Sequence, residues 1–212
     1  MQLQTGIGTQ AGVMQQPPEI VTTKDLSYIQ DALSWELLAA KKFGMYAQMA
    51  QEQGVKDICE RLSRMHQNHY QKLLSHLNPA KAIANQPTSQ YHREVKTVPP
   101  NSKMIQNPQA GTLPKVKGPQ MNDRDILNDV LATEKYLTDN YNVFAREASY
   151  PALHSDVESI LCDTHKAARD SFNAMFQRGW YKFEGVEQQK LQQAQQQFSG
   201  YLGQFPYPDV LQ

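Results

Sequence analysis

The sequence predicts an all-α protein, a four-helix bundle built from two helical hairpins that are joined by a long proline-rich crossover. Four segments carry apolar residues at alternating three- and four-residue steps, which keep to one face of a helix. The second pair of segments repeats motifs of the first, since Asp31 to Glu36 reads DALSWE and Asp129 to Glu134 reads DVLATE. Because each pair is too short to bury an adequate core alone, we expect both to share one bundle.

Composition divides the 212 residues into five parts. The two hairpins have helical periodicity, whereas the two ends are rich in glutamine and cannot bury enough apolar surface to offset their ordering cost. The predicted parts are a flexible arm at 1–22, a first hairpin at 23–78, a crossover linker at 79–121, a second hairpin at 122–182 and a Gln-rich tail at 183–212.

The first hairpin has recognisable helix ends. Thr22 or Thr23 can cap its first helix with a hydroxyl group. Gly54 is expected to form the tight turn between the helices, and Pro79 ends the second helix because proline cannot continue it. Two polar residues alone interrupt the apolar stripes of this hairpin, Glu36 and His69.

The linker carries six prolines between residues 87 and 119 and has no sustained periodicity, which indicates an extended connection. A segment of about forty residues can reach well over 100 Å at about 3.3 Å per residue. The third helix can therefore start at either end of the first hairpin. Two chains could also exchange hairpins across such a linker, so reach alone leaves the topology open.

In the second hairpin, Asn122 with Asp125 starts the third helix, and its apolar stripe contains Glu134. Gly179 ends the fourth helix, where a left-handed cap favours glycine. Beyond it, residues 183–200 have weak helical character within a glutamine run.

Charge and cysteine content exclude several classes of function. The chain has 21 Lys and Arg residues against 21 Asp and Glu residues, which gives no field that would gather nucleic acid or an anionic membrane. We therefore expect protein partners, with no nucleic acid and no membrane insertion. Cys59 and Cys162 lie on or beside inner helix stripes and are expected to serve packing. Residues 1–22 lack the pattern of a signal peptide, so we expect synthesis in a cytosol.

Residues 122 to 182 resemble the coat F family of bacterial spore coat proteins. The resemblance is carried by the opening Asn-Asp-Arg-Asp-Ile at 122–126, the central Glu134 and the ending Gly179-Trp180-Tyr181. It implies a ferritin-like bundle and a protein that is made in the mother-cell cytoplasm of a Gram-positive endospore former and deposited on the spore coat. Its implied partners are other spore coat proteins, with a homo-oligomer as a further option.

Five polar residues on or beside the stripes are candidate metal ligands: Glu36, His66, His69, Glu134 and His165. Ferritin-like di-metal proteins place four carboxylates and two imidazoles inside the bundle. Here His66 and His165 stand where two of the glutamates belong, and Ala168 replaces the last histidine. Because di-iron chemistry depends on bridging carboxylates, we expect no ferroxidase and no other enzymatic activity.

Two interpretations of these residues stay open. The favoured one is a buried network in which Glu36 and Glu134 pair with the histidines, so that no cofactor is needed. The alternative is a metal-binding or redox protein with a degenerate ferritin-like site, in which a single divalent ion such as Zn²⁺ is held by histidine nitrogen and glutamate oxygen. The sequence favours a structural protein of the spore coat, which assembles through protein contacts.

Overall fold

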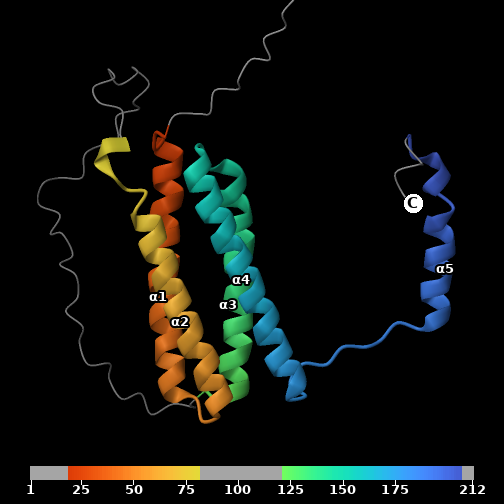
Figure 1. Ribbon diagram of the computed structural model, residues 1–212. Helices are drawn as coiled ribbons and strands as arrows, with labels where there is room; N and C mark the ends of the chain where they lie inside the picture. Colours follow the sequence, from red (N-terminus) through yellow and green to blue (C-terminus); the bar gives the residue numbers. More distant parts are fainter. Residues whose placement is uncertain (1–18, 82–120, 207–212) are drawn as a thin grey trace, which may run out of the picture.

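The protein is a bundle of four antiparallel-paired helices with a fifth helix beyond it (Figure 1). The computed structural model describes residues 19–81 and 121–206, and no strand occurs among them. The predicted all-α four-helix bundle is confirmed. The helices are α1 (Thr23–Met49), α2 (Gln53–Leu74), α3 (Asp123–Glu147), α4 (Pro151–Gln177) and α5 (Gln188–Ser199), with short 3-10 helices at Pro79–Lys81 and Leu202–Gln204.

The helix directions follow from contacts at the two ends of the bundle. The backbone N–H of Ser149, after α3, donates to Asp25 Oδ1 at the start of α1 (3.1 Å). Arg178, after α4, donates to Glu52 Oε2 at the start of α2 (2.8 Å). Each helix of one hairpin therefore runs antiparallel to its neighbour in the other. As a result α2 ends and α3 begins at opposite ends of the bundle, as in bundles with one long crossover.

The two hairpins are related by a constant spacing of 98 residues, which separates Asp25 from Asp123 and Gln51 from Ser149. The equivalent residues make equivalent bonds across the bundle. Asp25 accepts from the backbone of Ser149 in the α3–α4 turn, and Asp123 accepts from the backbone of Gln51 in the α1–α2 turn (2.8 Å). Each hairpin thus closes the turn of the other with one buried aspartate.

The helix ends test the predicted caps. Thr22 forms a capping box with Asp25, and Asn122 forms one with Asp125, so both predicted N-caps are confirmed. Gly179 has a φ of 70°, the left-handed cap predicted for it. The expectation for Gly54 is wrong, because the turn precedes it and Gly54 lies in the first turn of α2. Its missing side chain instead leaves room for Arg178, whose Nη2 lies 3.0 Å from where a Cβ would be.

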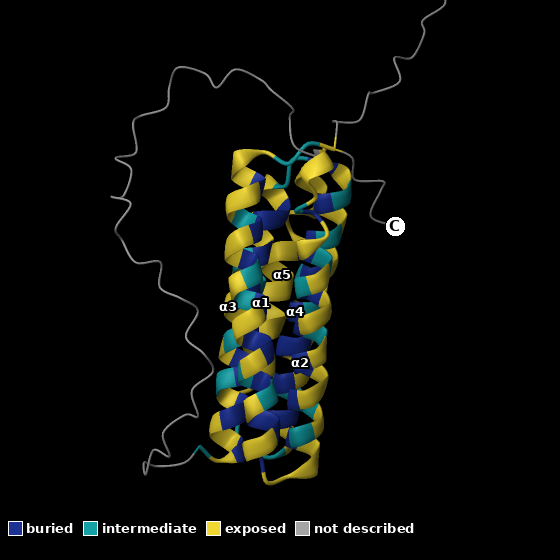
Figure 2. Ribbon diagram, turned by 90° about the vertical axis from the view of Figure 1, so that its left-hand side faces the viewer, coloured by how far each residue is buried: buried dark blue, intermediate teal, exposed yellow. Residues whose placement is uncertain are grey.

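The core runs along the bundle axis, and Figure 2 shows the inward faces of the four helices buried and their outward faces exposed. The predicted arm to residue 18, the crossover at 82–120 and the last six residues lie outside the described residues. Within the described ranges, no helix has both the length and the apolar character needed to cross a bilayer. The largest fully buried side chains include Tyr141, Tyr150, Phe43, Phe144, Ile29 and Leu62.

We expect Asp25→Ala to lower the free energy of unfolding by about 3 kcal/mol, because it leaves partly buried donors of Thr22 and Ser149 without their charged acceptor. Urea denaturation at neutral pH measures the loss. Asp31→Ala is the control, since Asp31 is exposed on the same helix. Equal losses in the two variants would contradict the assigned role of Asp25.

The same contribution should depend on pH. Burial raises the pKa of Asp25, but the hydrogen bonds from Ser149 and Thr22 outweigh burial and hold the pKa below its usual value of 3.8. A carboxyl whose pKa is lower in the folded protein stabilises the fold above its unfolded pKa, and this contribution is lost as pH falls through the folded pKa. The stability difference between the wild type and Asp25→Ala should therefore shrink in acid, whereas a constant difference would refute the linkage.

Candidate functional site

Four of the five predicted polar residues meet in the centre of the bundle. Glu36 comes from α1, His66 and His69 come from α2, and Glu134 comes from α3. Glu36, His66 and Glu134 are fully buried, and His69 is 3% exposed. Their helix positions explain the convergence, because each lies on the inward stripe of its helix.

The imidazole of His66 bridges the two carboxylates. Its Nδ1 lies 2.6 Å from Glu36 Oε2, and its Nε2 lies 2.9 Å from Glu134 Oε1. The hydroxyl group of Tyr141 on α3 donates to the other oxygen of Glu36, Oε1, at 2.5 Å. One histidine therefore connects α1, α2 and α3 in the buried interior.

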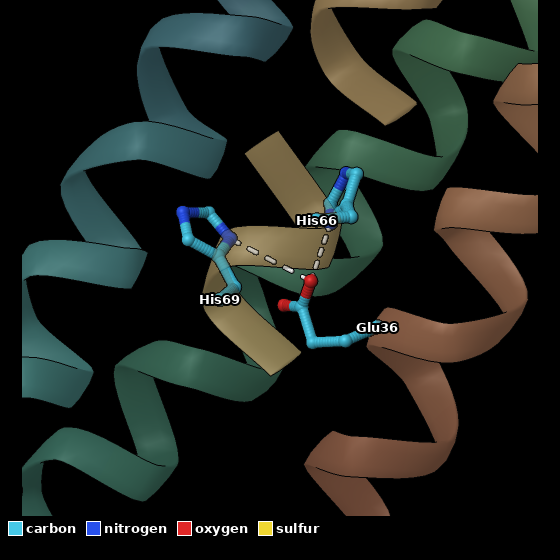
Figure 3. A group of neighbouring side chains, drawn as sticks. All are labelled: Glu36, His66 and His69. Atoms are coloured by element: carbon cyan, nitrogen blue, oxygen red, sulfur yellow. Dashed lines mark hydrogen bonds and ion pairs between the residues drawn. The ribbon is translucent and has the colours of Figure 1, made fainter. Parts of the chain in front are cut away.

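His69 occupies the edge of this cluster. Its Nδ1 lies 3.5 Å from Glu36 Oε2, within ion-pair distance but without a hydrogen bond (Figure 3). Its Nε2 lies 3.4 Å from Oδ2 of Asp163 on α4, a side chain that is 41% exposed. Among the described residues, His69 Nδ1 and Glu134 Oε2 are the buried side-chain atoms that lack a hydrogen-bond partner. The cluster therefore contains two buried polar atoms without a hydrogen bond, one on α2 and one on α3.

Burial and pairing set the charges of the cluster. Burial lowers the pKa of His66, but Glu134 and Glu36 outweigh it and raise the pKa to about 9, so the ring is an imidazolium at neutral pH. Burial raises the pKa of Glu36, yet its contacts with His66 and His69 lower the pKa further than burial raises it. For Glu134, burial prevails over His66 and the pKa is raised. Glu36 is therefore the more acidic of the two carboxyl groups that flank His66.

His165 does not join the cluster, which corrects the expected equivalence of His66 and His165. The 98-residue spacing pairs His66 with Thr164 and His69 with Ala167, and His165 is exposed. A shift of one residue turns a helical side chain by about 100°. Thr164 accepts a hydrogen bond from Thr138 (3.2 Å) and donates to the backbone of Leu161 (3.0 Å). The equal spacing of Glu36 from Glu134 could have identified Thr164 from the sequence.

One further histidine is buried just beyond the end of α2, and the expectation for Cys162 on α4 is corrected. His76 is 3% exposed, with Nδ1 2.8 Å from Tyr150 Oη and Nε2 2.8 Å from Asp156 Oδ2. No sequence spacing signals this end contact, because its partners lie beyond the crossover. Cys162 was expected on or beside an inner stripe but is exposed, whereas Cys59 is buried and burial raises its pKa to about 11.

The cluster does not fit a di-metal centre of the ferritin type. Such a centre needs a Glu-x-x-His pair from each of two helices besides the two single glutamates. Here α2 supplies His66 and His69, and α4 supplies Thr164 and Ala167 at the equivalent positions. The carboxylates that bridge two metals are therefore replaced. What the structure does bring together is one donor atom each from Glu36, His66 and His69, all within 4.8 Å of one another.

We expect Glu36→Leu to destabilise the bundle by about 3–5 kcal/mol, because it leaves a buried imidazolium with one fewer carboxylate. Replacing Glu36, His66 and Glu134 together by leucine should recover most of this loss, since all three charged groups are removed. Urea denaturation measures both, with Glu60→Leu on the exposed face of α2 as the control.

The same triple variant tests whether the network selects the helix pairing. We expect more than one set of backbone amide resonances in its NMR spectrum, because an all-leucine centre packs in several registers. A single native-like set would show that apolar packing alone selects the arrangement.

The 98-residue spacing also explains why Glu134 Oε2 lacks a partner. The equivalent of Tyr141 is Phe43, which is fully buried against His66 (ring centroids 5.3 Å apart) but has no hydroxyl group. We expect Phe43→Tyr to raise the free energy of unfolding by about 1 kcal/mol by supplying that hydrogen bond. Tyr141→Phe should lower it by about 1–3 kcal/mol, because Glu36 loses a donor. Thermal unfolding compares the two, and destabilisation by Phe43→Tyr would contradict the assigned equivalence.

Comparison with known proteins relates the second hairpin to a protein family. Residues 122–184 match the coat F domain, a stretch that contains α3 and α4. The uncharacterised protein YusN of Bacillus subtilis (strain 168) is 44% identical over 94 residues, which cover 44% of this chain and 83% of YusN. YuzM, an uncharacterised protein of the same strain, is 46% identical over 65 residues, which cover 31% of this chain and 80% of YuzM.

One solved structure shares the fold. It comes from Bacillus halodurans C-125 and is provisionally described as a spore coat protein. The two structures superpose with a TM-score of 0.52 over 76% of this chain and 93% of that chain, at 9% sequence identity. At this identity the likeness concerns the helical architecture.

Proposed function

The chain belongs to the coat F family, and we propose on this basis that it is a structural component of the bacterial endospore coat. In this proposal it is made in the mother-cell cytoplasm and held in the coat by contacts with other coat proteins. Family membership is the observation that carries the proposal. The shared architecture of the protein from Bacillus halodurans is consistent with it.

Exposed apolar side chains on the bundle support assembly through protein contacts. A groove between α1 and α3 is lined mainly by apolar and aromatic side chains, with Lys42 and Thr133 also in its lining. Leu38 is 65% exposed there and Tyr136 is 58% exposed. Trp35 forms one wall and meets the ring of Tyr136 edge to face. Contiguous apolar surface of this kind marks a site of protein contact.

Helix α5 provides a second apolar surface. Leu191, Ala194 and Phe198 lie three and four residues apart and share one helix face, and every residue of α5 is exposed. Stacking of Phe183 on Phe176 (4.9 Å between ring centroids) anchors the segment that leads from the bundle to α5, which stands apart from the bundle in Figure 1. A twelve-residue helix is marginal in water without packing. We infer that α5 packs against a neighbouring coat protein.

The interior of the bundle supports a structural role as well. The positions of a di-metal oxidase centre are occupied by His66, Thr164 and Ala167, which do not offer bridging carboxylates. The buried ion-pair network instead joins three helices. We therefore propose that the protein acts through its surface and that its interior maintains the shape of that surface.

Fractionation of spores tests the coat role. The full chain, expressed during sporulation of Bacillus subtilis, is expected in the coat fraction of purified spores, detected with an antibody against the chain. Leu191→Ser with Phe198→Ser should shift most of it to the mother-cell lysate, because the apolar stripe of α5 is lost. Gln193→Ser with Gln197→Ser is the matched control on the same helix. Recovery of the wild-type chain outside the coat fraction would reject the coat role, and equal behaviour of the two variants would reject α5 as the contact.

A further inference from the structure

Three buried side chains at the bundle centre have the donor set of a mononuclear metal site. Glu36 contributes a carboxylate oxygen, and His66 and His69 each contribute a ring nitrogen, with the three atoms within 4.8 Å of one another. Zn²⁺ binds nitrogen and oxygen donors at about 2.0–2.2 Å, so its ligands in a tetrahedral site lie roughly 3.3–3.5 Å apart. Glu36 Oε2 and His69 Nδ1 already have this separation, 3.5 Å. His66 Nδ1 lies closer to Glu36, at 2.6 Å, and a movement of under about 1 Å would accommodate an ion.

His69 is the observation that points to a ligand. Its Nδ1 is buried, faces Glu36 in Figure 3 and makes no hydrogen bond. A buried polar atom without a partner costs free energy, so such atoms call for an explanation. A cation between Glu36 and the two imidazoles would give His69 Nδ1 a direct bond in addition to its 3.5 Å contact with Glu36 Oε2.

The groups around the three donors have the arrangement found around bound metals. A metal-binding histidine usually gives its other ring N–H to a carboxylate, which sets its tautomer and orientation. His66 meets Glu134 through Nε2 (2.9 Å), and His69 meets Asp163 through Nε2 (3.4 Å). In both rings Nδ1 therefore faces Glu36 while Nε2 faces a carboxylate. The hydroxyl group of Tyr141 donates to the second oxygen of Glu36 and so orients this carboxylate.

We propose that Glu36, His66 and His69 bind one divalent cation of borderline softness, with Zn²⁺ as the best match to two imidazoles and one carboxylate. The proton on His66 Nδ1 is released to solvent when the ion binds, because only an unprotonated ring nitrogen is a metal ligand. Glu134 and Asp163 orient the histidines in this site and are not ligands, because each contacts the ring nitrogen that faces away from Glu36. His165 is exposed and takes no part. Three protein ligands leave a fourth position for water or a small anion.

The proposal is independent of the coat role. All three ligands come from α1 and α2, whereas the match to the coat F domain covers residues 122–184. A protein that fails to enter the coat could still bind the ion, and a coat protein could lack it. The two proposals can therefore fail separately.

The site is tested by reloading chelator-treated full-length protein with Zn²⁺, removing excess ion by dialysis and measuring zinc per chain by elemental mass spectrometry. Isothermal titration with Zn²⁺ measures the affinity. We expect one ion per chain in the wild type and loss of the ion in His69→Gln. This variant should keep the fold, checked by circular dichroism, because His69 is the least tightly bonded member of the cluster. His165→Gln is the matched control, an exposed histidine whose loss should leave binding unchanged.

Asp163→Asn tests the orienting groups, since removing such a carboxylate typically weakens metal binding 10- to 100-fold. We expect a weakening in this range with the stoichiometry retained at high Zn²⁺ concentration. Wild-type protein without stoichiometric zinc after reloading would overturn the proposal. So would zinc retained by a folded His69→Gln variant or lost from His165→Gln, because either result would place the ion elsewhere on the chain.

Discussion

The imidazolium of His66, held between the carboxylates of Glu36 and Glu134, is the interaction on which the bundle centre depends. It joins three helices at fully buried positions, and its two carboxylates come from different hairpins. Such a group is costly to bury, so each partner must stay in place for the others to be tolerated. The relative rotation of α1, α2 and α3 is therefore restricted to arrangements that keep both ring nitrogens paired.

The two hairpins make equivalent contacts at the ends of the bundle, but they contribute different residues to its centre. Asp25 and Asp123 close each other's turns in the same way, and both hairpins begin with a capping box. In the middle, α2 contributes His66 and His69, whereas α4 contributes the small residues Thr164 and Ala167. The cluster is therefore asymmetric: the three proposed metal ligands lie on α1 and α2, and the carboxylates that orient the histidines lie on α3 and α4.

Surface and interior contribute separately to the functions proposed here. The groove between α1 and α3 and the apolar face of α5 concern contacts with other proteins, and neither includes a residue of the central cluster. A rigid interior benefits a coat component because assembly surfaces keep their shape only if the helices beneath them keep their relative positions. An ion bound by Glu36, His66 and His69 would add to that rigidity without altering the outer surface.

The sequence alone determined the helices, the caps at Thr22, Asn122 and Gly179 and the inward placement of Glu36, His69 and Glu134, because these depend on local periodicity and backbone chemistry. Three features required the tertiary structure. The directions of α3 and α4 relative to α1 and α2 depend on which helix ends are neighbours, because the linker is long enough for either arrangement. Which residue of the second hairpin is equivalent to His66 depends on the exact register of α4, in which the buried Thr164 is next in sequence to the exposed His165. The burial of His76 depends on Tyr150 and Asp156, which lie more than seventy residues along the chain and become neighbours only when the hairpins pack.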